Sequence, residues 1–305
     1  MKAAIILNGI SVYKAKFYRD LLPLLQLVLY CDVFETQSQG DAITLAANAI
    51  ANHYDVVFAA GGDGTVNQVV NGMLRGYEPP ARLPVLGVLP LGSGNDFARS
   101  VGANLNMQQI LAALREERFR KIDVGEVTYK SDEGSQGHRY FVNVVDVGMG
   151  PEVVSKVAAS GRAFGSAFSY YRAIVSTFFT YKPITMHARA GDWQWHSPMR
   201  TFAIANGKYY GNGLCIAPEA ALDDGEFDVF ACGGAGVFDF ILQSIPLKKG
   251  RKVKHQKVSY MKTKQVHLSS DGPVRIEADG EILGWLPASV YLSSIELQTL
   301  DLRSS

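Results

Sequence analysis

The feature that most constrains the fold is a glycine-rich loop between an apolar run and a helical pattern. The apolar run 55–60 leads directly into Gly-Gly-Asp-Gly-Thr at 61–65, and a helical pattern follows over 65–75. Glycines allow positive φ angles and let backbone N–H groups approach a ligand closely. The helix N-terminus that follows adds a partial positive charge suited to phosphate. This order of strand, loop and helix indicates either a nucleotide phosphate site or a simple tight turn.

A second loop of the same kind follows the next apolar run, 84–89. It contains Gly-Ser-Gly at 92–94 and leads into a helix at Asp96. Loops after adjacent parallel strands meet at the carboxyl edge of the sheet, where α/β folds bind ligands. We therefore expect Asp63 and Asp96 near each other, either beside a divalent cation or as helix caps. Neither loop has the spacing of a P-loop, a dinucleotide fingerprint or a hydrolase nucleophile turn.

The hydrophobic pattern predicts two domains. Over residues 1–120, apolar runs alternate with helical patterns, which predicts a Rossmann-like parallel α/β domain. Its expected strands are 2–7, 27–34, 55–60 and 84–89, and its expected helices are 41–52, capped by Asp41, 65–75 and 107–117. Residues 121–288 predict a mainly antiparallel β domain that would hold the substrate, interrupted by one helix over 166–181. The last segment, 289–305, can return to either domain, and we expect it to complete the first.

The expected strands of the second domain are short and separated by turns. They are 121–129, 139–147, 185–190, 200–206, 226–231, 253–258, 265–268 and 274–278.

Composition excludes several classes of protein. The formal net charge is +1, so nothing global indicates a nucleic-acid partner. The three cysteines, Cys31, Cys215 and Cys232, are widely spaced, and the six histidines lack metal-ligand spacing, which argues against a disulfide framework or a zinc site. The N-terminal apolar run is too short for a secretory signal, and no apolar stretch reaches about 18 residues. We therefore expect a cytoplasmic protein that meets any lipid substrate from outside the membrane.

Four motifs in this order resemble the diacylglycerol kinase catalytic-domain family, and most of all its soluble bacterial lipid kinases. They are Gly61–Asn67 with Asn71-Gly72, then Leu89–Arg99, then Ala217–Gly225, and finally Asp279-Gly280-Glu281. The resemblance covers nearly the whole chain. It implies a first domain like that of NAD kinases and phosphofructokinases and a second domain like a β-sandwich.

The activity implied by this resemblance is transfer of the γ-phosphoryl group of ATP, with Mg²⁺, to the hydroxyl of diacylglycerol or a similar lipid. Alternative acceptors remain open: a sphingoid base, phosphatidylglycerol or NAD. A non-catalytic nucleotide- or lipid-binding protein is a further alternative.

The resemblance also implies roles for individual residues, carried over by position. The ATP site would comprise Asn8, Thr36, Gly61, Gly62, Asp63, Gly64, Thr65, Val66, Asn67 and Ser93. Magnesium ligands would be the Asp224 side chain and the backbone carbonyls of Ala221 and Glu226, although Asp-Gly at 224–225 also suits a plain hairpin turn. Glu281 would accept the proton of the lipid hydroxyl, and Asp63 would also take part in catalysis.

The chain departs from the family pattern in its first loop. The family usually has Asn-Pro-x-Ser-Gly after the first strand, whereas this chain has Asn-Gly-Ile-Ser-Val at 8–12. Gln68 stands where Glu is usual, and Ser93 stands where Thr is commoner but keeps the hydroxyl. Phosphate contacts of the first loop are therefore in question, and Lys14 or Lys16 can compensate for them.

Two further segments bear on lipid contact. Basic residues gather between 248 and 264 without an acidic residue: Lys248, Lys249, Arg251, Lys252, Lys254, Lys257, Lys262 and Lys264. Such a stretch either docks on an anionic membrane surface, gaining up to ~1 kcal/mol per charge, or is a solvated face. The expected helix 166–181 carries Phe168, Tyr170, Tyr171, Phe178 and Phe179, which we expect in the core, with one side open to a lipid groove. Transient membrane association and a homodimer are both left open.

Overall fold

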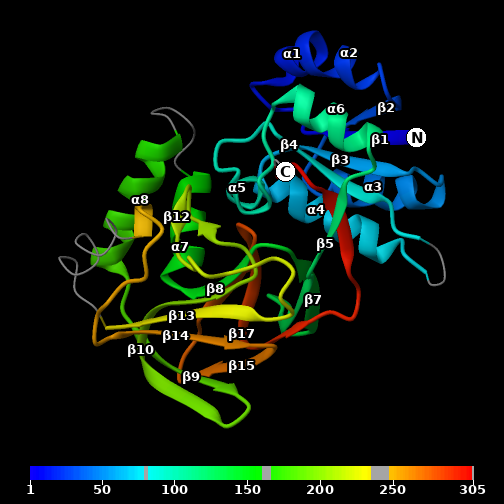
Figure 1. The fold of residues 1–305 in the computed structure, drawn as a ribbon. Helices are drawn as coiled ribbons and strands as arrows, with labels where there is room; N and C mark the ends of the chain where they lie inside the picture. Colours follow the sequence, from blue (N-terminus) through cyan, green and yellow to red (C-terminus); the bar gives the residue numbers. More distant parts are fainter. Residues whose placement is uncertain (79–81, 160–165, 235–246, 304–305) are drawn as a thin grey trace. The chain divides into compact units, whose positions relative to one another are not determined.

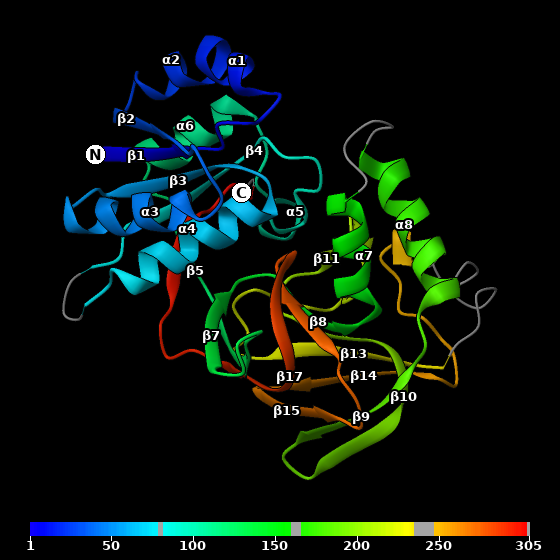
Figure 2. The same cartoon turned by 180° about the vertical axis from the view of Figure 1, so that it is seen from behind.

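The computed structural model describes residues 1–78, 82–159, 166–234 and 247–303, and the side chains of 158–159 and 166–171 are not among the described ones. The chain divides into two compact units (Figures 1 and 2). Unit 1 comprises Met1–Asp123 and Ile295–Ser305, and unit 2 comprises Val124–Ser294. Each unit is described by itself below.

Unit 1 is built on a sheet of six strands in the order β2-β1-β3-β4-β18-β5. Four of these strands are parallel neighbours: β1 (Lys2–Leu7), β2 (Tyr30–Glu35), β3 (Val56–Gly61) and β4 (Val85–Pro90). At the other side, β18 (Leu297–Leu300) pairs in parallel with β4 and antiparallel with β5 (Phe119–Ile122). The helices are α1 (Lys14–Lys16), η1 (Phe17–Leu21), α2 (Leu22–Leu25), α3 (Asp41–Ala51), α4 (Asp63–Arg75), α5 (Asp96–Val101) and α6 (Met107–Arg115).

The central strands are apolar along their whole length because helices cover both faces of the sheet. All residues of β3 are buried, and so are five of the six in β1. Figures 1 and 2 show α3 and α4 on one face and α6 with α1 and α2 on the other. The parallel α/β architecture expected for this part of the chain is confirmed.

Helix α3 corrects one detail of the sequence analysis. Its N-cap is Gly40 with φ +91°, and Asp41 is the first helical residue. The carboxylate of Asp41 accepts the backbone amides of Gln37 and Ser38, both at 2.7 Å. Asp41 therefore closes the preceding turn and does not cap the helix.

Unit 2 is a mainly antiparallel β structure, as expected. Its large sheet follows the order β14-β13-β10-β8-β16-β17-β15-β9, and β9 pairs back onto β10, so that six of these strands form a closed circuit. The strands are β6 (Gly125–Lys130), β7 (Gln136–Phe141), β8 (Val144–Gly148), β9 (Ile184–Ala190), β10 (Trp193–Ala205), β13 (Phe227–Gly233), β14 (Val258–Thr263), β15 (Gln265–Ser270), β16 (Arg275–Ala278) and β17 (Glu281–Leu292). A small ladder joins β11 (Tyr209–Tyr210) to β12 (Leu214–Cys215).

The described part of unit 2 includes the helices α7 (Met149–Ala159) and α8 (Ser166–Thr180). The core of the unit is made by large buried side chains from its strands, including Phe141, Phe202, Phe227 and Ile276. None of the helices in the described ranges is both long enough and apolar enough to cross a membrane.

Several strand boundaries differ from the sequence prediction. The run 121–129 was expected to be one strand, but it contains β5 and β6, which belong to different sheets. The run 139–147 likewise contains two strands, β7 and β8. Apolar residues continue across the boundary between β5 and β6 and across that between β7 and β8. Local hydrophobicity alone therefore does not reveal where one strand ends and the next, with a different pairing partner, begins.

The prediction of a strand over 253–258 is wrong. The chain there is irregular until β14 begins at Val258. Val253 is buried, and its amide donates to the hydroxyl of Tyr260 at 3.1 Å. The alternation that predicted a strand reflects one-sided burial of a loop.

Candidate functional site

The carboxyl ends of the parallel strands of unit 1 bring three predicted loops into contact. After β1, the Nδ2 of Asn8 lies 3.4 Å from Oγ1 of Thr65, in the first turn of the helix α4 that follows β3. Ser11 Oγ donates to the carbonyl of Leu91, after β4, at 2.8 Å. The loop after β2 joins them, because Gly9 N donates to Oγ1 of Thr36 at 3.1 Å. The expected meeting of the two glycine-rich loops at one sheet edge is confirmed.

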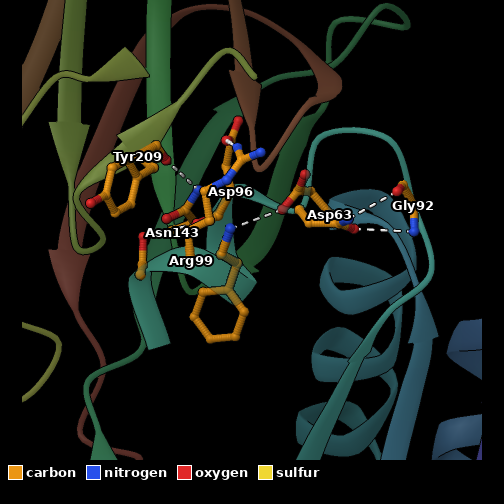
Figure 3. Close-up of polar contacts among 9 residues, drawn as sticks. Asp63, Gly92, Asp96, Arg99, Asn143 and Tyr209 are labelled. Carbon is orange, nitrogen blue, oxygen red and sulfur yellow. Dashed lines mark hydrogen bonds and ion pairs between the residues drawn. The ribbon is translucent and has the colours of Figure 1, made fainter. Parts of the chain in front are cut away.

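The two glycine-rich loops touch backbone to backbone. A Cβ atom at Gly92 would lie 2.3 Å from Cα of Gly62, closer than any side chain allows. A Cβ at Gly61 would lie 2.3 Å from the hydroxyl oxygen of Thr65. The second loop is held by Asn95, whose side chain bonds both the amide and the carbonyl of Gly92, at 3.1 and 2.9 Å (Figure 3). Glycine is therefore required here by the close approach of the loops themselves.

Asp63 and Asp96 lie around the same glycine, as expected. A Cβ at Gly94 would be 2.8 Å from Oδ2 of Asp63 and 4.0 Å from Oδ2 of Asp96. The other oxygen of Asp63 accepts the backbone amide of Phe97 at 2.9 Å, and Oδ1 of Asp96 pairs with Arg99 at 2.8 Å (Figure 3). Asp63 thus joins the start of α4 to the start of α5, and Asp96 is held by an ion pair within α5.

The remaining residues predicted for the ATP site differ in their surroundings. Ser93 is exposed at the tip of its loop, and Gly62 and Gly64 are partly exposed. Val66 and Asn67 are buried inside α4, and the carbonyl of Asn67 accepts Nδ2 of Asn71 at 2.9 Å. Side chains at 66 and 67 therefore support the helix and do not face the loop surface.

Lys14, expected to compensate for the altered first loop, is engaged locally. Its ammonium forms an ion pair with Glu35, at the end of β2. The same carboxylate accepts the hydroxyl of Tyr18 at 2.5 Å. Lys14 would have to leave Glu35 to reach a phosphate.

In unit 2, Glu281 begins β17 directly after a two-residue hairpin turn. Asp279 and Gly280 both have positive φ angles, +51° and +85°, which is typical of a tight Asp-Gly hairpin. The Asp279 carboxylate accepts the amides of Val142, Asn143 and Val144, each at 3.0 Å. This turn is therefore fixed to the 142–144 segment, which places Glu281 at the start of a well-anchored strand.

The 142–144 segment is itself held from a second side. The side chain of Asn143 donates to the carbonyl of Tyr209 at 2.9 Å (Figure 3), and Asn206 donates to the carbonyl of Val142 at 2.9 Å. Sequence reasoning missed Asp279 as an anchor, although it stands in the Asp-Gly-Glu motif that drew attention to Glu281.

The loop predicted to bind magnesium carries carboxylates of suitable chemistry. Asp224 and Asp228 both contact the ammonium of Lys262, at 2.5 and 3.3 Å. Oδ1 of Asp224 also accepts the amide of Glu226 at 3.3 Å, and Gly225 has φ +71°. The plain hairpin alternative is wrong, since Leu222 lies in a turn and not in a strand. The donors fit a hard cation, and the cation they contact here is the lysine ammonium.

Acidic partners neutralise part of the basic stretch 248–264. Lys252 pairs with Glu219 at 2.5 Å, and Lys262 pairs with Asp224. Lys257 donates to the carbonyl of Gly234 at 2.8 Å. Lys249, Arg251 and Lys254 are exposed.

Unit 2 contains an apolar pocket that opens to solvent. Its wall is formed by α7, α8 and the strands β10 and β13, through residues such as Met149, Val153, Ile174, Phe178 and Phe230. Phe178 is buried, as expected for a core residue, and also lines this pocket. Phe179 was expected in the core too, but it is 71% exposed. The expectation for Phe168, Tyr170 and Tyr171 falls on side chains outside the described ones.

A buried polar cluster closes one end of this pocket. Asp146 on β8 lines the pocket, and it lies opposite Glu277 of β16 in the strand pairing. The hydroxyl of Tyr210 is 2.9 Å from Oδ2 of Asp146 and 2.7 Å from Oε1 of Glu277. Both carboxyl groups are fully buried.

The ionisation of this cluster is shifted by its surroundings. Burial raises the pKa of Asp146 well above its usual range, and the charge of Glu277 adds to the effect. Burial likewise raises the pKa of Glu277 to about 7, against the opposing hydrogen bond from Tyr210. Sequence analysis did not single out these residues, although a carboxylate inside the apolar run 141–148 is a signal in itself.

Two family models match this chain. The diacylglycerol kinase catalytic domain matches residues 2–127, and a domain described as the YegS C-terminal NAD kinase beta sandwich-like domain matches residues 143–302. The chain belongs to the diacylglycerol kinase catalytic-domain family. Members of this family are lipid kinases, and this protein is an enzyme of that class.

Relatives of similar length support this assignment. A diacylglycerol kinase of Staphylococcus saprophyticus is 28% identical over 94% of this chain and 91% of its own length. A diacylglycerol kinase of Staphylococcus aureus is 28% identical over 94% of this chain and 88% of its own. The crystal structure of a diacylglycerol kinase from Bacillus anthracis covers 98% of this chain and 96% of its own, with a TM-score of 0.71 at 19% identity. A second structure from that organism has a TM-score of 0.76 at 21% identity and supports the same fold.

Proposed function

We propose that this lipid kinase transfers the γ-phosphoryl group of ATP to the hydroxyl of diacylglycerol or a similar lipid. The observation that carries the proposal is the backbone contact between the two glycine-rich loops of unit 1, with Asp63 between them. Such loops offer backbone amides to phosphate groups, and α4, a helix of 13 residues, begins at Asp63. The family of the chain supports the same activity.

In this proposal ATP lies against the loop edge of unit 1. Gly61, Gly62, Gly64 and Thr65 surround its phosphates, and Ser93 adds a hydroxyl from the second loop. Asn8 and Thr36 border the site, through the contacts that join their loops to Thr65 and Gly9. Val66 and Asn67 contribute through the helix that they stabilise. Oδ2 of Asp63 lies beside Gly94, where it would orient a cation or the nucleotide.

Magnesium would be held in unit 2 by Asp224 and by the backbone carbonyls of Ala221 and Glu226. By its resemblance to the family's structural magnesium loop, such an ion would pin the turn at Asp224 and Gly225. Lys262 must first move away from the carboxylate of Asp224, because the two form an ion pair. Mg²⁺ binding is therefore expected to compete with the Lys262–Asp224 ion pair.

Glu281 would accept the proton of the lipid hydroxyl as the oxygen attacks phosphorus. A carboxylate within hydrogen-bond reach of a reacting hydroxyl contributes on the order of 10²–10⁴-fold to a rate. The anchored hairpin supports this role. Three hydrogen bonds from backbone amides to the Asp279 carboxylate fix the turn before the strand that begins at Glu281.

The lipid itself would enter the apolar pocket of unit 2. That pocket is lined mainly by apolar side chains, which suits an acyl chain. The exposed cations Lys249, Arg251 and Lys254 would contribute to transient contact with an anionic membrane surface. A homodimer stays a prediction, which sedimentation velocity would test.

Phosphate transfer from radiolabelled ATP to a panel of acceptors tests the proposal. The panel contains diacylglycerol, phosphatidylglycerol, a sphingoid base and NAD, each supplied with Mg²⁺. We expect product with diacylglycerol or another hydroxylated lipid and none with NAD. Labelled NADP, or no labelled product from any lipid, would contradict the proposal.

A substitution at Asp63 links that activity to the loop site. Asp63→Asn keeps an oxygen for the amide of Phe97 and removes the charge. We expect turnover to fall on the order of 10²-fold, as for loss of one electrostatic contact to the reacting group. Asp20→Asn is the matched control, since Asp20 forms an exposed ion pair with its neighbour Arg19. Equal turnover of the two variants would remove Asp63 from the site.

A further inference from the structure

The ammonium of Lys262 is shared by two carboxylates that belong to different parts of unit 2. Asp224 lies in the turn that precedes β13, and its Oδ2 is 2.5 Å from the Lys262 ammonium. Asp228 lies within β13, directly opposite Lys262 in the pairing with β14, and its Oδ2 is 3.3 Å from the same ammonium. One side chain of β14 therefore ties the turn to the sheet, through the carboxylate that the proposed magnesium site needs.

The two carboxylates differ in how much they depend on this lysine. The Asp224 side chain is 28% exposed, so solvent and dissolved ions can reach it. The Asp228 side chain is 5% exposed and lies opposite Ala205, which belongs to a buried apolar cluster with Phe230. Oδ2 of Asp228 is buried and has no hydrogen-bond partner within the described ranges. A buried carboxylate that loses its cation is strongly destabilised, so we expect Lys262 to stay with Asp228.

The other cation near Asp228 is committed elsewhere. The charged groups that act on Asp228 are Lys262, Asp224 and Lys252. The ammonium of Lys252 pairs with Glu219 at 2.5 Å and lies 5.2 Å from the centre of the Tyr260 ring. Compensation of the buried Asp228 charge therefore depends mainly on Lys262.

We propose that Lys262 is an internal cation that holds the Asp224 turn without magnesium, and that Asp228 retains the lysine when Asp224 binds Mg²⁺. This inference rests on the proposed function, because the magnesium site at Asp224 is part of it. If Asp224 were the sole partner of Lys262, metal binding would leave an unpaired ammonium beside a divalent cation. Asp228 avoids this cost, because the ammonium stays in contact with one carboxylate throughout the exchange.

The exchange allows the turn to be formed before it binds the metal. The ion pair of Lys262 with Asp224 closes the turn onto β14, and metal binding then breaks one of the two contacts of the lysine. A preformed site loses less conformational entropy on binding. The charges at positions 262 and 228 therefore set the affinity for Mg²⁺.

Isothermal titration calorimetry with Mg²⁺ alone, on the full-length protein without ATP or lipid, tests the inference. Binding that is absent in Asp224→Ala is assigned to this turn. Lys262→Met keeps a long side chain and removes the charge, so Mg²⁺ should bind there at least about tenfold more tightly. Lys264→Met is the matched control, because Lys264 follows β14 directly, is exposed, and forms no ion pair in the part of the chain that the structure describes. It should stay within about threefold of wild type.

A double-mutant cycle separates retention of Lys262 from simple attraction of the metal. Asp228→Asn keeps the shape of the side chain, and it should weaken Mg²⁺ binding at least about tenfold while Lys262 is present. In the Lys262→Met background the same substitution should weaken binding by less than about threefold, because no ammonium then needs a second carboxylate. An equal loss in both backgrounds would mean that Asp228 attracts the metal directly, which would overturn its proposed role.

Two further measurements do not depend on binding heats. Lys262→Met should melt at a lower temperature than wild type in EDTA, and Mg²⁺ should raise its Tm by at least about 2 °C more than that of wild type. Labelling of wild-type lysines with acetic anhydride, followed by mass spectrometry, needs no variant to fold. Mg²⁺ should raise the labelling of Lys262 relative to Lys264, because the ammonium of Lys262 leaves one of its two carboxylates.

The failure of this inference is distinguishable from failure of the kinase activity. Wild-type Mg²⁺ affinity in Lys262→Met, or labelling of Lys262 that Mg²⁺ does not change, would overturn the exchange. Neither result bears on phosphorylation of a lipid, because these assays contain no ATP and no lipid. Absence of any Mg²⁺ binding that depends on Asp224 would overturn both the exchange and the magnesium site of the proposed function.

Discussion

At the scale of single residues, the acidic side chains of this protein are used in contrasting ways. Asp279 is buried, but its carboxylate accepts three backbone amides and so has a complete set of partners. Glu277, only two residues earlier, shares one tyrosine hydroxyl with Asp146 and has an oxygen that no described residue partners. A hydrogen-bonded carboxylate stabilises a fold, whereas an uncompensated buried one favours its protonated form.

The raised pKa of Glu277 makes stability depend on pH. Its pKa is about 7 in the folded chain and about 4.3 when unfolded, so the folded state binds more protons between these values. The free energy of unfolding should therefore fall as pH rises through this interval and level off above it. Glu277→Gln removes this loss, so relative to wild type the variant gains ~3 kcal/mol from about pH 5 to about pH 8.

Urea unfolding at those two pH values measures the effect. Glu133→Gln is the matched control, because Glu133 is exposed and its one side-chain hydrogen bond within the described ranges is to Ser131 at 3.3 Å. Parallel pH profiles for Glu277→Gln and wild type would show that the carboxyl group ionises normally.

Some residues of the candidate site were predictable from local sequence and others were not. Asp63 and Asp96 follow adjacent strands, so their closeness follows from parallel topology. Asp146 and Glu277 are 131 positions apart, and only the register of β8 against β16 brings them together. That register depends on the packing of the whole β unit, which no local pattern encodes.

At the scale of elements, the two glycine-rich loops act as one structural piece. Gly92→Ala would force the loops apart, because the new Cβ would lie 2.3 Å from Cα of Gly62. We expect ATP affinity to fall at least about tenfold and the free energy of unfolding to fall by about 1–3 kcal/mol. Isothermal titration calorimetry with ATP and urea unfolding measure the two effects.

Gly234→Ala is the control for that substitution. No atom of the described residues lies within 4 Å of a Cβ at Gly234, so both quantities should stay at wild-type values. If Gly92→Ala binds ATP as tightly as this control, close contact of the loops is not needed for the nucleotide.

Element boundaries show what hydrophobic patterning can and cannot give. Strand β1 was predicted to the residue, because a short apolar run bounded by polar residues has one interpretation. Helix α7 was missed, although Pro151 near its start is typical of a first helical turn. The first part of β10 was also missed, since half of its side chains face solvent and include polar residues.

At the scale of the whole molecule, the last strand, β18, belongs to the same unit as the first 123 residues. After the β unit, β18 inserts between β4 and β5 of unit 1, and the hydroxyl of Thr299 donates to the carbonyl of Leu86 at 2.9 Å. Leu297 and Leu300 are buried in that unit. Unit 1 is therefore complete only with a segment that follows unit 2 in the sequence.

Deletion of residues 295–305 should destabilise unit 1 strongly. Exposing two buried leucines alone is expected to cost ~3–6 kcal/mol, before the loss of strand pairing. Differential scanning calorimetry measures this, with Glu296→Gln as the control, because Glu296 forms an exposed ion pair with Lys121 at 2.5 Å. The control should change stability by less than ~1 kcal/mol. A truncated chain that melts like the control would contradict this account of β18.

The central claim joins ATP bound by the loops of unit 1 to a proton acceptor, Glu281, from unit 2. It is tested most directly by measuring ATP affinity and lipid phosphorylation side by side in Glu281→Gln. We predict that ATP affinity stays within about threefold of wild type while turnover falls on the order of 10²–10⁴-fold. Wild-type turnover in Glu281→Gln, with ATP still bound, would contradict the claim.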